Sequence, residues 1–401
     1  MHPAFDPVTG PLTKALLYMP IRAGGGLGIP CPELVHFRRE ALLPIVFAHK
    51  DKFPWLAKWE GRYKQTLAFT PSKKANATGS AIAITALHVL RKDDATWHTQ
   101  LLTLSKHKRP SIRAAAVRAL ITAPADTEKL LAAAKNNLSH RAWQVRTAAI
   151  DLLVAIRSAK SPPLLFARLE KEKARMHEDV RTALRDLTGL QFATLREWQQ
   201  WWDKEGNTFQ PRLRNADMPG RNGDNKTVSY WNIPVHSDRV AFIVDTSGSM
   251  LKPFGSGNAT RLWEAKRQLR TVFDALPPKA KINVITFAGD TTSLFAKLQT
   301  LGKKQRKQAE SFVKALPGKG PTNVHDALEA AFADRDVDTI FLLTDGQPSS
   351  GPIVDREALA DEVRRWNADR GIRIHTIAIG QKSKLLARLA KDSGGEHSVS
   401  R

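Results

Sequence analysis

Cysteine is almost absent from this chain of 401 residues, since Cys31 is the only one. A single cysteine excludes a disulfide framework within the chain, and it equally excludes a zinc cluster built from the thiolates of one chain. We interpret Cys31 as an inert side chain rather than a reactive thiol.

Long apolar runs are absent as well. Because no stretch reaches 18 apolar residues, we expect no transmembrane helix. The N-terminus, Met1 to Pro7, lacks a basic segment followed by an apolar one, so as written it is not a secretory signal. A start codon placed too late would hide such a signal. The sequence therefore leaves the compartment open: cytoplasmic as written, exported if the true start lies upstream.

The composition is that of a globular protein with an excess of positive charge. Apolar residues make up 42% and charged residues 25%, which excludes wholesale disorder and a collagen-like structure. The length predicts two or three domains. Lysine and arginine number 62 against 39 acidic residues, a net charge of +23. Residues 236–401 hold 26 basic and 19 acidic side chains, so residues 1–235 carry +16 and favour acidic partners such as nucleic acid, anionic lipid or acidic protein.

Residues 1–78 and 79–204 differ in character. The first segment mixes Pro and Gly with aromatic and basic residues, and we interpret it as an irregular N-terminal segment. The second is rich in Ala, Leu and Arg, with apolar residues at helical spacing. Similar stretches begin in it near Ile112, Val145 and Val180, at offsets of 33 and 35. A shorter apolar helix is expected between successive copies. Paired helices at this period indicate an α-solenoid, and the pattern resembles HEAT repeats.

Three arginines recur at equivalent positions of these repeats, namely Arg113, Arg146 and Arg181. We expect them to form a ladder along one side of the stack. Their predicted role is to bond neighbouring carbonyl groups or acids such as Asp151 and Asp186.

A tryptophan-rich helix is expected within 191–204, where Trp198, Trp201 and Trp202 share one face. One interpretation is a capping helix that covers the open end of the solenoid. The other is an aromatic platform for nucleic-acid bases. Residues 205–235, rich in Gly, Asn, Pro and Arg, are a predicted linker.

From residue 236 onward, continuous apolar strands alternate with amphipathic helices. This pattern predicts a parallel sheet covered by helices on both faces, with its site at the carboxyl ends of the strands. The expected strands are Val240–Val244, Ile282–Phe287, Leu294–Leu298, Thr339–Thr344, Ile372–Ile379 and a short last one around His397–Val399. The expected helices are Arg261–Leu276, Lys303–Leu316, Val324–Ala333, Arg356–Arg370 and Lys384–Lys391.

Polar side chains follow two of these strands and begin one of the helices. Asp245, Ser247 and Ser249 occupy alternate positions after the first strand, so their oxygens can converge on one point. Asp345 follows the fourth strand at the same sheet edge, and Thr322 stands where a helix begins. Two carboxylates and three hydroxyls suit an octahedral Mg²⁺ or Mn²⁺ ion. Zinc is disfavoured because no His or Cys joins the set.

These motifs resemble the von Willebrand factor type A domain and its metal-ion-dependent adhesion site. The Asp-x-Ser-x-Ser pattern at 245–249 is complete, Thr322 lies in Gly-Pro-Thr-Asn, and Asp345 lies in Thr-Asp-Gly. The resemblance covers about 236–401, with one departure at Pro321, where glycine is common before the threonine. It implies a doubly wound, Rossmann-like α/β domain that follows the α-solenoid.

The resemblance also implies roles for the site residues. In this family the hydroxyls of Ser247, Ser249 and Thr322 would contribute to the metal site, Thr322 sometimes through water. Asp245 and Asp345 would bind directly or hold coordinated waters, and the remaining position is left for an acidic side chain of a partner. The order of helical repeats followed by this domain resembles a class of bacterial proteins that combine HEAT repeats with a type A domain.

Three interpretations of function follow. The first is a protein–protein interaction scaffold without catalytic residues, in which the metal takes an acidic residue of a partner, such as an AAA+ ATPase or an envelope protein, and the repeats give a second, basic surface. The second is a nucleic-acid-associated protein that binds through its basic N-terminal half, although no reader motif is present. The third is a Mg²⁺-dependent hydrolase, which needs a general base and a substrate pocket, and the sequence shows neither. A Ser247–His325–Asp345 hydrolytic triad can also be imagined, but no nucleophile elbow or oxyanion motif accompanies it. We expect the first, without enzymatic activity.

Overall fold

The computed structural model describes residues 93–123, 125–213 and 228–400, together with residues 81, 84, 85, 88 and 91. The irregular segment predicted for 1–78 lies outside the described residues, and so do residues 214–227 of the predicted linker. The chain divides into two compact units, Met1–Ile156 and Arg157–Arg401, which are described separately.

In the part of the chain that the structure describes, no helix is long and apolar enough to cross a membrane.

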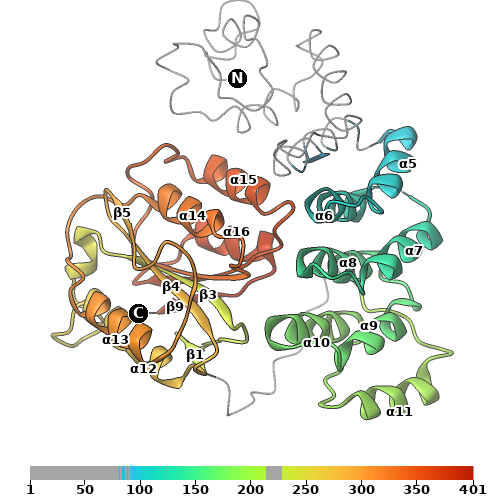
Figure 1. Cartoon of the computed structure of the whole chain (residues 1–401), viewed down its shortest axis with the longest axis horizontal. Coiled ribbons are helices and arrows are strands. Elements are labelled where there is room, and N and C mark those ends of the chain that lie inside the picture. The colour runs from blue at the N-terminus through green and yellow to red at the C-terminus, as the bar shows by residue number, and fades with distance from the viewer. Residues whose placement is uncertain are drawn as a thin grey trace, which may run out of the picture. The chain divides into compact units, whose positions relative to one another are not determined.

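The described part of the first unit is helical. It contains α5 (Ala95–Leu104), α6 (Pro110–Ala119), the short 3₁₀ helix η4 (Leu120–Thr122), α7 (Thr127–Asn137) and α8 (Trp143–Ile156). Helix α8 packs against both α6 and α7 (Figure 1). Small buried alanines permit this close approach; they include Ala114, Ala116, Ala148 and Ala149. The helical character predicted for this region is confirmed.

Two of the three recurring arginines can be followed here. Arg113 donates to the carbonyl of Asn136 at the end of α7, at 3.2 Å. Arg146 donates to two carbonyls of the loop that precedes α8, at 2.9 and 3.1 Å. Both contacts are of the predicted carbonyl type. Asp151 pairs with Arg118 at 3.3 Å. The arginine that binds this acid is therefore not one of the three recurring ones.

The second unit begins with three helices, α9 (Ser161–Leu169), α10 (Ala174–Thr188) and α11 (Leu195–Glu205). Helix α11 carries the tryptophans. The Trp198 ring is 1% exposed and packs edge-on against Phe192 at 4.9 Å and tilted against Phe166 at 5.7 Å. Trp201 and Trp202 pack against each other at 5.7 Å. Because Trp198 is covered, its ring cannot stack on a nucleic-acid base. Trp201 and Trp202 are half-buried in the same aromatic cluster.

The rest of the second unit is an α/β fold around a mostly parallel sheet. The sheet has seven strands in the order β5-β4-β3-β7-β8-β9, with β6 also paired to β4. The parallel strands are β3 (Arg239–Asp245), β4 (Lys281–Phe287), β7 (Thr339–Thr344), β8 (Arg373–Ile379) and β9 (His397–Ser400). All five match strands expected from the sequence.

Helices cover both faces of this sheet, as predicted. Helices α12 (Arg261–Ala275) and α13 (Lys303–Lys314) lie on one face, and α14 (Val324–Ala333), α15 (Arg356–Trp366) and α16 (Lys384–Ser393) lie on the other (Figure 1). Every residue of β3 from Val240 to Asp245 is buried. Successive side chains of a strand point to opposite faces of the sheet, and helices cover both faces here. This explains why the strands appear in the sequence as continuous apolar runs.

One predicted strand is wrong. Residues 294–298 form no strand, and the short antiparallel strands β5 (Thr291–Ser293) and β6 (Gln299–Thr300) flank them instead, both paired with β4. The Asn283 side chain supplies the reason. Its amide accepts from the N–H of Phe295 at 3.0 Å and donates to the carbonyl of Phe295 at 2.8 Å, so a side chain takes the place of a strand partner.

The end of the predicted linker is also folded, contrary to expectation. Residues 229–234 form a hairpin of β1 (Ser229–Tyr230) and β2 (Ile233–Pro234). Trp231 and Asn232 make the turn with φ of +51° and +64°, the positive values that a tight hairpin turn requires. Tyr230 is fully buried and packs edge-on against Phe242 at 5.4 Å, which fixes the hairpin to the sheet.

Arg175, near the start of α10, is buried against the sheet. Its guanidinium donates to the carbonyls of Asp338 and Gly371 at 2.6 and 2.8 Å and pairs with Asp179 at 2.9 Å. Asp179 also pairs with Arg373 at 3.1 Å. Burial alone would raise the pKa of Asp179, but the two guanidinium groups outweigh it and hold that pKa below its usual value. Helix α10 is therefore tied to the sheet edge at which β7 and β8 begin.

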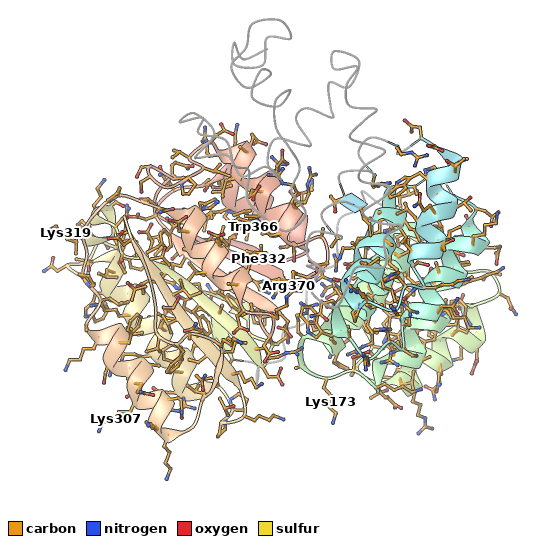
Figure 2. The ribbon with its side chains drawn as sticks, turned by 45° about the horizontal axis from the view of Figure 1, so that its top comes forward. Lys173, Lys307, Lys319, Phe332, Trp366 and Arg370 are labelled. Atoms are coloured by element: carbon orange, nitrogen blue, oxygen red, sulfur yellow. The ribbon has the colours of Figure 1, made fainter. Side chains whose placement is uncertain are left out.

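Replacing Arg175 by alanine should lower the free energy of unfolding by about 3 kcal/mol, because the change removes three buried interactions of one guanidinium. Denaturant unfolding of the whole chain measures this loss. Lys173→Ala is the matched control, since Lys173 is an exposed cation two residues away (Figure 2). Equal and small effects of the two substitutions would contradict the role given to Arg175.

Candidate metal site

The candidate site lies where β3 and β7 end. These two strands are parallel neighbours, with Val244 paired to Leu343, so the residues that follow them emerge at the same sheet edge. Asp245 is the last residue of β3, and Asp345 comes directly after β7. The sequence motif therefore folds as the strand pattern predicted, with both carboxylates at one edge.

Asp245 is more enclosed than expected. It belongs to the buried strand rather than lying beyond it, and it is 0% exposed. One carboxylate oxygen accepts from the N–H of Ser247 at 2.7 Å, and the other accepts from the hydroxyl of Thr344. Burial raises the pKa of Asp245 to about 6, although hydrogen bonds from Ser247 and Thr344 act against that rise. Asp245→Ala would leave two buried donors, the Ser247 N–H and the Thr344 hydroxyl, without this acceptor.

A chain of hydroxyls links Asp345 to the first loop. The 3₁₀ turn η5 (Gly248–Leu251) follows β3 and carries Ser249. The hydroxyl oxygens of Ser247 and Ser249 lie 3.1 Å apart, and Ser249 donates to the Oδ1 atom of Asp345 at 2.6 Å. Four of the five predicted residues are thus joined in one hydrogen-bonded network, through these contacts and the Asp245–Ser247 bond.

Thr322 reaches the same place from a third loop. A Cβ atom added to Gly346 would lie 3.4 Å from the Thr322 hydroxyl oxygen and 3.9 Å from that of Ser249, so both hydroxyls flank this glycine. The backbone of Thr322 is fixed by Ser349, whose hydroxyl accepts from the Thr322 N–H at 2.9 Å. Its own hydroxyl makes no hydrogen bond to any residue in the described ranges.

Backbone contacts hold this third loop against the first. The N–H of Gly248 donates to the carbonyl of Gly320 at 3.1 Å, and the N–H of Lys319 donates to the carbonyl of Thr246 at 2.9 Å. Gly320 has a φ of +100°, which glycine adopts without strain. Pro321 follows it and lies against Gly289, where an added Cβ would come within 3.3 Å of the proline ring. The loop that carries Thr322 is therefore closely packed.

Comparison with known proteins agrees with this fold. Residues 238–399 match the family model described as the von Willebrand factor type A domain. This part of the chain is a von Willebrand factor type A domain. The resemblance to a type A domain, proposed from the three sequence motifs, is confirmed for this segment.

Relatives share this type A domain within much longer chains. Human von Willebrand factor A domain-containing protein 3B is 26% identical over 202 residues, which are 49% of this chain and 14% of the relative. Human inter-alpha-trypsin inhibitor heavy chain H3 is 28% identical over 131 residues, 30% of this chain and 14% of the relative. A solved von Willebrand factor type A structure from Catenulispora acidiphila is 22% identical, with a TM-score of 0.36, and the match covers 42% of this chain and 40% of that one. The chain thus spans about one seventh of the two human relatives.

Sequence reasoning missed two contacts of the type A domain's site. One is the Thr344 hydroxyl on Asp245, and the other is Arg261, which pairs with the Oδ2 atom of Asp345 at 2.5 Å. Arg261 is the first residue of α12, after the N-cap Thr260. A cation in the first turn of a helix is disfavoured by the helix dipole. That unfavourable position was the available signal that Arg261 has a specific anionic partner.

His325 takes no part in a triad with Ser247 and Asp345 among the described contacts. Its Nδ1 atom lies 2.7 Å from Asp326, and its ring is 1% exposed and packs edge-on against Trp366 at 5.3 Å. Trp366 in turn contacts Phe332 between α14 and α15 (Figure 2). His325 is therefore a packed helix residue, and Asp345 is engaged by other groups.

Proposed function

We propose that the type A domain binds one Mg²⁺ or Mn²⁺ ion and that this ion takes an acidic side chain of a protein partner. The proposed ligand residues are Asp245, Ser247, Ser249, Thr322 and Asp345. The observation that supports this most is the meeting of their oxygens at one sheet edge: hydrogen bonds join four of the residues, and the Thr322 hydroxyl lies beside them.

The chemistry of these five residues suits a hard cation. All offer oxygen, and none is a His or Cys, which favours Mg²⁺ or Mn²⁺ over zinc. Two carboxylates, when ionised, balance the charge of a divalent ion. The free hydroxyl of Thr322 is available as a ligand without breaking a hydrogen bond to a described residue. Five residues cannot fill the six positions of an octahedral ion, so at least one position would stay open for a partner. At that position the bound ion would act as a Lewis acid toward the partner's carboxylate.

The surface beside the site favours a protein as the partner. Within the described part of the type A domain, the exposed large apolar side chains are Leu251, Trp263 and Val354, with exposures of 51%, 54% and 43%. Leu251 ends the turn that carries Ser249, Trp263 lies in the first turn of α12, and Val354 lies on the loop after β7. Exposed aromatic and aliphatic side chains near polar anchors are typical of protein interfaces.

The whole chain is best explained as a scaffold. The helical region, which resembles HEAT repeats, would give a second, basic binding surface, in keeping with the +16 charge of residues 1–235. The partner of the type A domain would offer an Asp or Glu to the metal. An AAA+ ATPase and an envelope protein are the two candidate classes of partner. We expect no catalytic turnover, because the candidate base His325 is engaged by Asp326 and Trp366.

The direct test of the metal proposal is a calorimetric titration of the full chain with Mn²⁺. We expect one ion to bind per chain and Mg²⁺ to displace it, because both ions accept an all-oxygen site. Ca²⁺, which takes more ligands at longer distances, should compete less well. Absence of saturable Mn²⁺ binding would contradict the proposal.

A further inference from the structure

Arg261 holds one of the two site carboxylates. Its Nη1 atom lies 2.5 Å from the Oδ2 atom of Asp345, whose side chain is 0% exposed while that of Arg261 is 21% exposed. The Oδ1 atom of Asp345 is held by the Ser249 hydroxyl. Both oxygens of Asp345 are thus engaged, one by a neutral donor and one by a full positive charge.

The fold makes room for this guanidinium. Gly380, directly after β8, has a φ of +83°, and a Cβ atom there would come within 2.7 Å of the Nη2 atom of Arg261. Any larger residue would collide with the guanidinium and would also be strained in this backbone conformation. The loop after β8 therefore accommodates the guanidinium beside Asp345.

The pairing changes the charge that the site offers to a cation. Without Arg261, two ionised carboxylates would give the site a formal charge of −2, and with it the charge is −1. A site with a charge of −1 attracts a divalent cation less strongly than a site with a charge of −2. Once the cation is bound, the −1 site also keeps more net positive charge, so it attracts an outside anion more strongly. The partly exposed guanidinium adds a second positive group that an incoming carboxylate can approach.

We propose that Arg261 determines the specificity of this site by weakening cation binding and strengthening the binding of an outside carboxylate. The inference rests on the proposed metal site and goes beyond it, since it assigns opposite effects of one residue on two ligands. A purely structural arginine would change both affinities in the same direction, because its loss would loosen the whole site.

The test compares four forms of the full chain: the natural sequence, Arg261→Gln, Arg261→Met and Arg261→Lys. The control is Arg270→Gln, which removes the same charge from an exposed position on the same helix. Calorimetry measures Mn²⁺ affinity. Broadening of the NMR signals of an acetylated, amidated Gly-Glu-Gly peptide by the bound Mn²⁺ measures carboxylate affinity, with Gly-Gln-Gly as the blank.

We expect Arg261→Gln and Arg261→Met to bind Mn²⁺ about tenfold more tightly and the Glu peptide about fivefold or more weakly. Arg261→Lys and Arg270→Gln should stay within about twofold of the natural chain, because each keeps a cation beside Asp345. Having two uncharged variants protects the test against one that fails to fold, which thermal unfolding would reveal.

Parallel changes in the two affinities, or no change in either, would overturn the role of Arg261 while leaving the metal site standing. If the natural chain and every variant failed to bind Mn²⁺, the proposed function itself would fail, and this inference with it.

Discussion

Asp245→Asn should lower the affinity of the chain for Mn²⁺ by about 100-fold or more, because it removes one of two carboxylate charges from the proposed site. Asparagine is the informative substitution. It keeps the side-chain volume and can still accept from the Ser247 N–H, and the Thr344 hydroxyl can rotate to accept from the new amide. Calorimetry with Mn²⁺ measures the affinity, and thermal unfolding checks that the fold is kept.

The matched control for this substitution is Asp290→Asn. Asp290 is an exposed residue directly before β5, so its replacement removes the same charge from a side chain that is not a proposed ligand. Its Mn²⁺ affinity should stay within about twofold of the natural chain. Unchanged Mn²⁺ binding by a folded Asp245→Asn variant would remove Asp245 from the ligand set.

Thr322→Ala should lower the amount of protein partner captured in the presence of Mg²⁺ by about tenfold or more. The substitution removes one proposed ligand oxygen. It should spare the fold, since the backbone hydrogen bonds of Thr322 to Ser349 do not need the hydroxyl. Ser247→Ala should act in the same direction, because the Ser247 hydroxyl is both a proposed ligand and a neighbour of the Ser249 hydroxyl.

Thr271→Ala is the control for the capture experiment. Thr271 is exposed on α12, and its hydroxyl bonds only a carbonyl of its own helix at 3.2 Å. This variant should retain every partner of the natural chain. Retention of the Mg²⁺-dependent partners by Thr322→Ala would mean that the binding surface lies elsewhere.

Much of the type A domain could be predicted from its sequence because strand and helix differ there in apolar periodicity. Strand β7 was predicted with its observed bounds, Thr339–Thr344, and so was helix α14, Val324–Ala333. Continuous apolar runs occur because both faces of the sheet are covered. The Asn283 side chain takes the place of a strand partner for Phe295. Apolar periodicity does not indicate such a side-chain contact, and the strand predicted at 294–298 was therefore wrong.

The site residues were predictable only as far as they lie on recognisable motifs. Asp245 and Asp345 sit directly at strand ends, where a sequence pattern and a sheet edge coincide. Arg261 lies 84 positions from Asp345, and its contact depends on the N-terminus of α12 and on the glycine at 380. Such a tertiary pair leaves only an indirect mark in one sequence, here a cation at an unfavourable helix position.

The hairpin at 229–234 shows a similar limit. A segment rich in Asn, Gly and Pro predicts a linker, yet Tyr230 and Trp231 are buried on the type A domain, at 0% and 5% exposure. The aromatic residues were the available signal, because burial of a large ring contributes on the order of 2 kcal/mol or more. They outweigh the turn-forming composition around them.

The measurement that tests the central claim most directly is partner capture by the full chain from its native cell, with Mg²⁺ in one sample and a chelator in the other. Metal-dependent recognition predicts a set of protein partners that is retained with Mg²⁺, lost with chelator and restored when Mg²⁺ is added back. Identical partner sets in the two samples would contradict the claim and leave the site a structural feature of the type A domain.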